Sequence, residues 1–130
     1  VDFDFSKLKI KNVFINSTNG DCLDFSFGNY ELKNIILKNC GDKAISIGEK
    51  SKLKGGEIKI EKAETGIASK DSSDVTLSNV FVRQTKNCFS AYRKKQEFAG
   101  SILRVKNYEC SEFQNKVSRD KNSIVILNKN

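Results

Sequence analysis

Leu23-Asp24-Phe25-Ser26-Phe27 is one copy of a short pattern that recurs every 22 residues along the chain. Large apolar residues take alternate positions in it, and polar or small residues lie between them. This alternation is typical of a β-strand with one buried face. A strand that returns at a fixed interval indicates a repeat protein whose copies stack on one another. The leading apolar position of successive copies is filled by Val1, Leu23, Ile45, Ile67 and Phe89.

A second motif follows the first in each repeat. Residues 10–15, Ile-Lys-Asn-Val-Phe-Ile, return in related form at 32–37 and 77–82, and more loosely at 105–110. In the third repeat we align Leu53-Lys54-Gly55 with the opening of this motif, which places glycine where the others have asparagine. Asparagine and glycine adopt a left-handed backbone most readily. The shared position therefore predicts a sharp bend between two short strands.

Together the two motifs predict an all-β fold, a right-handed parallel β-helix of about five coils with ~22 residues and three short strands in each. In the second repeat we expect strands near 23–27, 30–32 and 35–37. The main alternative is a leucine-rich repeat, whose period and opening consensus fit Leu32 to Cys40. That fold needs a helix or an open turn next, whereas residues 44–47 alternate as another strand. The pattern therefore favours the β-helix.

We expect a single β-helix segment over residues 1–130, cut from a longer chain whose remaining coils are its neighbours. Val1 already occupies a regular repeat position, whereas a terminal coil is normally atypical. After Phe89 the core column resumes at Val117, 28 residues later. This spacing predicts an insertion of about six residues, which we place as a loop at 93–100.

Composition excludes several classes of function. The chain has 130 residues with 23 Lys+Arg against 16 Asp+Glu, a formal charge of +7, and it contains no histidine. A Ser-His-Asp triad, a Cys-His nucleophile pair and a histidine-ligated metal site are therefore excluded. No apolar run approaches the ~20 residues of a membrane-spanning helix, so we expect no transmembrane segment. The lysines alternate along the sequence and the aromatic residues fall mostly in core columns, so nucleic acid is not an expected partner.

The four cysteines are expected to be small buried side chains with free thiols. Cys22 and Cys88 share a column three coils apart, roughly 14 Å at ~4.8 Å per coil. A disulfide needs Cα atoms within about 7 Å, so these two cannot pair. Cys110 falls in an inward column, and no Cys-x-x-Cys spacing suggests zinc.

Charged residues gather in three neighbouring columns that follow the first strand of each repeat. Stacking places them on one edge of the solenoid, where cations would attract an acidic glycan and a tyrosine would offer a flat face to a sugar ring. The carboxylates would position those cations or share a Ca²⁺ ion with the ligand. The alternative is a row of solvated ion pairs that contributes little. The candidate ligand-binding residues are Glu49, Lys70, Asp71, Tyr92, Arg93 and Lys94.

Residues 48–51, 65–73 and 91–95 resemble bacterial right-handed parallel β-helix proteins of the pectin-lyase-like superfamily. The resemblance covers about residues 1–110. It implies a secreted or cell-surface protein and a non-catalytic binding or scaffold module associated with acidic polysaccharide. The alternative within the same superfamily is a polysaccharide lyase or esterase acting on acidic glycans.

The sequence departs from the motifs of the known enzymes of that superfamily. It has no proline for the arginine motif of the lyases and no histidine for the hydrolases. No local motif supports Asp24 and Asp71 as the aspartate pair of the methylesterases. We therefore assign no catalytic residue, no metal site and no required cofactor.

Overall fold

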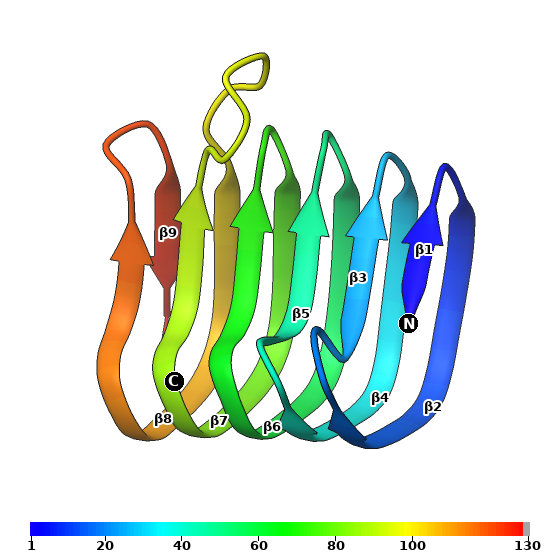
Figure 1. Cartoon of the computed structure of the whole chain (residues 1–130), viewed down its shortest axis with the longest axis vertical. Helices are drawn as coiled ribbons and strands as arrows, with labels where there is room; N and C mark the ends of the chain where they lie inside the picture. Colours follow the sequence, from blue (N-terminus) through cyan, green and yellow to red (C-terminus); the bar gives the residue numbers. More distant parts are fainter. Residues whose placement is uncertain (129–130) are drawn as a thin grey trace.

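The computed structural model describes residues 1–128, which fold as a parallel β-helix without any α-helix (Figure 1). The fold class predicted from the repeat is confirmed: parallel strands stack in a right-handed solenoid of about six turns of ~22 residues. The strands are β1 (Asp2–Asp4), β2 (Lys7–Thr18), β3 (Leu23–Ser26), β4 (Asn29–Cys40), β5 (Lys43–Gly48), β6 (Lys52–Lys70), β7 (Asp74–Tyr92), β8 (Ile102–Arg119) and β9 (Ile124–Leu127).

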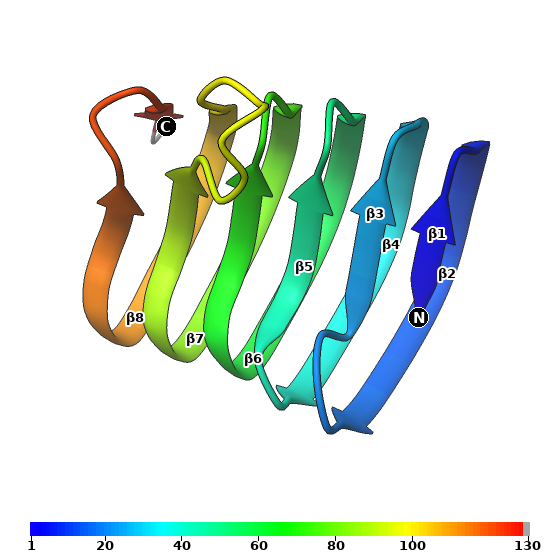
Figure 2. The same ribbon diagram turned by 45° about the horizontal axis from the view of Figure 1, so that its top comes forward.

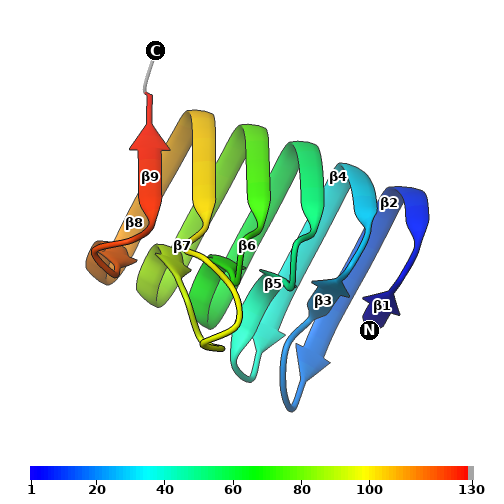
Figure 3. The ribbon, with the colours of Figure 1, turned by 90° about the horizontal axis from the view of Figure 1, so that it is seen from above.

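Each coil climbs a front wall, turns at the upper edge and descends a back wall (Figures 1 and 2). The front wall consists of β1, β3, β5 and the final segments of β6, β7 and β8. The back wall consists of β2, β4, β9 and the opening segments of the same long strands. The view from above separates the two walls, with the core between them (Figure 3).

Strand pairing follows the predicted core column. Leu23 pairs with Ile45, and Ile67 pairs with Phe89. The next partner of Phe89 is Val117, across the longer connection between β7 and β8. Ile45, Ile67 and Phe89 are all fully buried, so each stacks on the next in one apolar ladder. Each such side chain stabilises the fold by about 1.5–3 kcal/mol relative to an exposed position.

The short strands expected in each coil merge into longer strands that bend. Asn12 and Asn34 have φ values of 57° and 58°, as a left-handed bend requires. In the third coil the bend falls at Glu57, with φ of 55°, and not at Gly55. Leu32 pairs with Gly55, so the alignment of residues 53–55 with 32–34 was wrong by two positions. The turn between β5 and β6 displaces the back wall relative to a strict 22-residue repeat, since Asn29 pairs with Lys52.

The cysteines contradict the expectation of free thiols, because all four form disulfides. Cys22 bonds to Cys40 with a Cα–Cα distance of 5.5 Å, and Cys88 bonds to Cys110 at 6.4 Å. Cys22 and Cys88, three coils apart on one wall, do not pair with each other. Each observed disulfide instead joins the foot of the front wall to the back wall, where two different columns meet.

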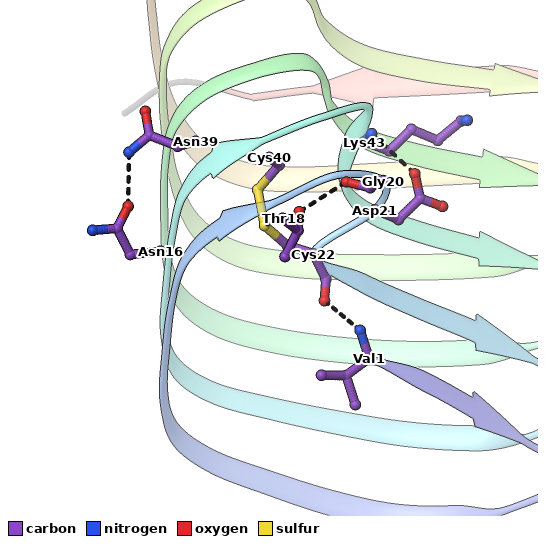
Figure 4. The surroundings of a disulfide bond; sticks show 9 residues. All are labelled: Val1, Asn16, Thr18, Gly20, Asp21, Cys22, Asn39, Cys40 and Lys43. Carbon is purple, nitrogen blue, oxygen red and sulfur yellow. Dashed lines mark hydrogen bonds between the residues drawn. A yellow bond between two sulfur atoms is a disulfide. The ribbon is translucent and has the colours of Figure 1, made fainter.

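The surroundings of the Cys22–Cys40 disulfide are shown in Figure 4. The hydroxyl of Thr18 donates to the carbonyl oxygen of Gly20 at 2.8 Å and lies 3.4 Å from Cys22 Sγ. The amide nitrogen of Asn39 donates to Asn16 Oδ1 of the preceding coil at 2.7 Å. These polar links and the disulfide fix the lower corner, where the chain passes from the back wall to the next front wall.

Candidate functional site

The predicted ligand-binding residues lie where the front-wall strands end and the turns begin. Figure 1 shows these turns along the upper edge. Lys70 and Tyr92 close their strands. Glu49 and Asp71 open three-residue turns with φ values of 44° and 51°, and Arg93 and Lys94 open the long turn 93–101. The structure thus brings all six to adjacent coils of one edge.

Burial differs among these residues, and Glu49 and Tyr92 are half-buried. Arg93 and Lys94 are exposed, but Lys70 is only 8% exposed and Asp71 is fully buried. Lys70 therefore does not extend freely into solvent. Its side chain lies along Gly48 of the preceding coil, where an added Cβ would be 3.5 Å from Lys70 Cε. Because Gly48 has no side chain, the lysine can lie flat on the front wall.

Asp71 holds the long turn in place. Its Oδ1 accepts hydrogen bonds from the backbone N–H groups of Lys94 at 2.7 Å and Lys95 at 2.9 Å. The other end of the turn is fastened to the neighbouring residue, since Ser72 Oγ accepts from the N–H of Ala99 at 2.8 Å. A buried carboxylate that accepts two backbone hydrogen bonds has a structural role here. Asp71 consequently contributes no surface for a ligand.

The long turn also contacts coils on both of its sides. Lys95 Nζ lies 3.5 Å from Glu49 Oε1, two coils towards the N-terminus. In the other direction, the N–H of Arg93 donates to Asp120 Oδ2 at 2.8 Å, and this hydrogen bond lowers the pKa of Asp120. The side chains of Arg93 and Lys94 remain exposed on this fastened turn. They are therefore presented to solvent by a backbone that is held at both ends.

An aromatic stack at the same edge was not predicted as a functional feature. Phe5 and Phe27 stack with ring centroids 4.7 Å apart and an interplanar angle of 6°, although Phe5 is 73% exposed. The ring centroid of Phe98, in the long turn, lies 6.2 Å from that of Phe27. Phe5 and Phe27 share a column with Glu49 and Asp71, so their place in a turn was already visible in the sequence. That column position distinguishes them from the core aromatic residues.

Small residues in the middle of the front wall make room for the long side chains at its upper end. Ser46, Ala68 and Ser90 pair with one another along an outward column, and all three are buried. Ser46 Oγ has no hydrogen-bond partner among the described residues. Outward positions of an exposed sheet are normally solvated, so this burial indicates that neighbouring side chains cover the column.

Partial burial changes the acidity of the groups on the front wall. Burial lowers the pKa of Lys70, and the nearby ammonium of Lys43 lowers it further, while Asp24 opposes the shift. Burial raises the pKa of Asp24, although the charge of Lys70 opposes this. Burial also raises the pKa of Tyr92, against the effect of Lys43. We call Asp24, Lys43, Lys70 and Tyr92 the front-wall cluster. These four groups interact in a setting that is partly shielded from water.

Within this cluster the carboxylate of Asp24 favours the charged form of Lys70 but forms no salt bridge with it. Lys43 forms a salt bridge with Asp42 at 2.9 Å, but no salt bridge within residues 1–128 involves Lys70. The ammonium groups of Lys43 and Lys94 oppose its charge, whereas the carboxylates of Asp24 and Asp21 favour it. A partly dehydrated ammonium without a salt-bridge partner is costly. An anionic group from a ligand would remove that cost.

The back wall carries a second charged surface, formed by lysines that alternate along the sequence. Strand pairing places Lys9, Glu31 and Lys54 in one outward column, and Lys11 and Lys33 in the next. Two cavities of about 590 and 640 Å³ lie along these columns. We call this surface the lysine face; its members are Lys7, Lys9, Lys11, Lys33, Lys52, Lys54 and Lys106.

Residues 1–128 contain no cluster of three or more acidic or thiol side chains arranged to hold a metal ion. They also contain no helix with the length and hydrophobicity to cross a bilayer. Comparison with models of protein families, with curated proteins and with solved structures gives no match for this chain.

Proposed function

We propose that this chain is a non-catalytic binding module of a secreted or cell-surface bacterial protein, and that it holds an acidic polysaccharide at the upper end of its front wall. The observation that carries the proposal is the side chain of Lys70, which lies mostly buried along the front wall and forms no salt bridge within residues 1–128. A uronate carboxylate or a sulfate placed against its ammonium would give it a salt-bridge partner. Tyr92 beside it offers a ring face for a sugar, and Arg93 on the fastened turn can grip a carboxylate in two places.

Two further features support the proposal. A pectin-lyase-like β-helix, which the sequence resembles, presents flat parallel walls on which a linear glycan can lie along several coils. The two disulfides fit an oxidising compartment such as the cell surface or the extracellular space. Ca²⁺ is not needed in this proposal, because Asp71 is committed to backbone N–H groups and Glu49 to Lys95.

The test compares a de-esterified oligogalacturonate with the same oligomer in methyl-esterified form, by calorimetry on the parent protein. Lys70→Met combined with Arg93→Ala should weaken binding of the charged oligomer by roughly tenfold or more. The matched control, Lys59→Met with Lys86→Ala, removes the same charge elsewhere and should bind like the parent. Equal binding of the two oligomers, or an unchanged affinity of the Lys70 variant, would contradict the proposal.

The pH dependence gives an independent check. A bound anion favours the protonated form of Lys70, so affinity should fall as pH rises through the lowered pKa of this group. The Lys70→Met variant should lose this part of the pH dependence. The melting temperature of each variant, measured without ligand, separates loss of binding from loss of fold.

One observation favours a lyase as a second candidate. A lysine with a lowered pKa can act as a general base, removing the proton next to a uronate carboxyl group so that the glycosidic bond breaks by elimination. Such a reaction leaves an unsaturated sugar that absorbs ultraviolet light. Incubation of polygalacturonate with the parent protein and with Lys70→Met distinguishes the candidates. Binding without unsaturated product supports the non-catalytic module, whereas product formed only by the parent supports the lyase.

A further inference from the structure

The lysine face concentrates positive charge on one stretch of the back wall. Its seven members come from β2, β4, β6 and β8, so residues far apart in sequence meet on one surface. No salt bridge within residues 1–128 involves any of them. Glu31 and Glu57 are the carboxylates that line the same cavities. Paired strands lie ~4.8 Å apart and alternate residues of a strand ~7 Å apart, so neighbouring ammonium groups such as those of Lys11 and Lys33 repel one another, whereas Glu31 lies between Lys9 and Lys54.

The surface is hollowed as well as charged. The cavity of about 590 Å³ has Lys9, Lys11, Lys33 and Lys54 along its lining, together with the adjacent glycines 55 and 56. A Cβ added at Gly56 would meet no atom within 4 Å, so the space above this position is open. The hollow crosses successive coils, and it therefore runs along the axis of the solenoid. A narrow chain with regularly spaced anions fits these features.

We propose that the lysine face is a second binding surface, which takes a linear sulfated or carboxylated polysaccharide along the solenoid axis. The proposal takes the ligand class from the proposed function, but it uses residues of the other wall. The hollow follows the axis of the solenoid, as a linear chain requires, and no aromatic ring lines the 590 Å³ cavity to stack on the bases of single-stranded nucleic acid. Acidic polysaccharide is therefore the partner that the charge and the shape favour together.

A binding measurement at several salt concentrations tests the proposal with heparin as the sulfated probe and polygalacturonate as the carboxylated one. Lys9→Gln, Lys33→Gln and Lys54→Gln combined should weaken binding of the preferred probe by roughly tenfold near 0.15 M salt. The slope of log affinity against log salt concentration should fall by about two to three. The two probes show whether sulfate or carboxylate is preferred.

Two matched variants separate a built surface from a general effect of charge. Lys59→Gln, Lys86→Gln and Lys121→Gln combined remove the same charge from other exposed positions, and should keep the affinity within about twofold. Gly56→Leu fills the hollow at constant charge, and should weaken binding by several fold. Equal losses in both lysine triples, or unchanged binding in Gly56→Leu, would overturn the proposal.

The remaining outcomes are also decisive. Tighter binding of anionic phospholipid vesicles or of duplex DNA at the same salt concentration would show that the partner class is wrong. The Lys70→Met/Arg93→Ala variant distinguishes this inference from the front-wall site. If that variant binds normally while the lysine-face triple does not, the front-wall proposal fails and this one stands. The reverse result would overturn the lysine face and leave the front wall.

Discussion

The front-wall cluster and the lysine face place the same residue type in opposite settings. Lys70 lies flat and is 8% exposed because its neighbours are Gly48 and a column of small residues. Lys9 and Lys54 lie on either side of Glu31 in one outward column of the back wall and are exposed. The comparison shows that lysines at outward positions of the same β-helix can be either partly dehydrated or solvated. This distinction separates a single anion site from an extended electrostatic surface.

The largest expected effect comes from the core that both walls share. Ile67→Asp places a carboxylate in a fully buried apolar ladder and should lower the free energy of unfolding by about 3–5 kcal/mol. Because coils support one another, both walls should lose their order together. Urea denaturation followed by circular dichroism measures the loss, and Ile67→Val serves as a mild control. An unchanged unfolding midpoint for Ile67→Asp would contradict the strand register.

A smaller loss is expected when the two walls are unlinked. Each disulfide ties the front wall to the back wall, and replacing Cys88 and Cys110 with serine should cost about 3 kcal/mol. The corresponding change at Cys22 and Cys40 should cost a similar amount, because the two bonds close segments of similar length. Thiol titration of the unreduced parent in denaturant should find no free thiol. Finding four thiols would restore the expectation from sequence.

The smallest effect separates the two walls directly. Lys70 has a lowered pKa in the folded protein, so the unfolded chain binds more protons between that pKa and 10.5. The unfolding free energy of the parent should therefore rise with pH across this window, relative to Lys70→Met. At neutral pH, Lys70→Met should melt at a higher temperature than the parent. Lys33→Met, the matched change on the lysine face, should alter the melting temperature little.

Thermal melts of the parent and the two variants from neutral pH to pH 10.5 complete this comparison. A difference between the parent and Lys70→Met that does not change with pH would show that the burial of this lysine has no energetic consequence. The distinction between the walls would then rest on geometry alone.

The sequence predicts the core of this fold well, because the core depends on two periodicities that are visible in one dimension. The column through Ile45, Ile67 and Phe89 follows from the period of two within a strand and the 22-residue interval between strands. The alignment fails at Gly55, since a fixed interval takes no account of the length of each turn. The pairing of Cys22 with Cys40 was missed for a related reason. It depends on where two columns meet at a corner, which repeat spacing does not describe.

The candidate surfaces were predicted less completely. Sequence columns bring the six upper-edge residues to one place, but they do not reveal that Asp71 is buried under the turn that it fastens. Alternating lysines on β2 and β4 look scattered in a linear sequence. They become one surface only when strand pairing aligns Lys11 with Lys33 and places Lys9 and Lys54 on either side of Glu31.

The turns of the upper edge differ greatly in length, from residues 5–6 and 27–28 to the long turn 93–101, while the strands on either side keep their pairing. Added residues at this edge are therefore accommodated outside the stacked core. In protein engineering, such a position is a natural acceptor for foreign peptide. A sequence exchanged for residues 95–98 would be displayed on a rigid stem, provided that Asp71 and Ser72 keep the backbone contacts that fasten the turn at each end.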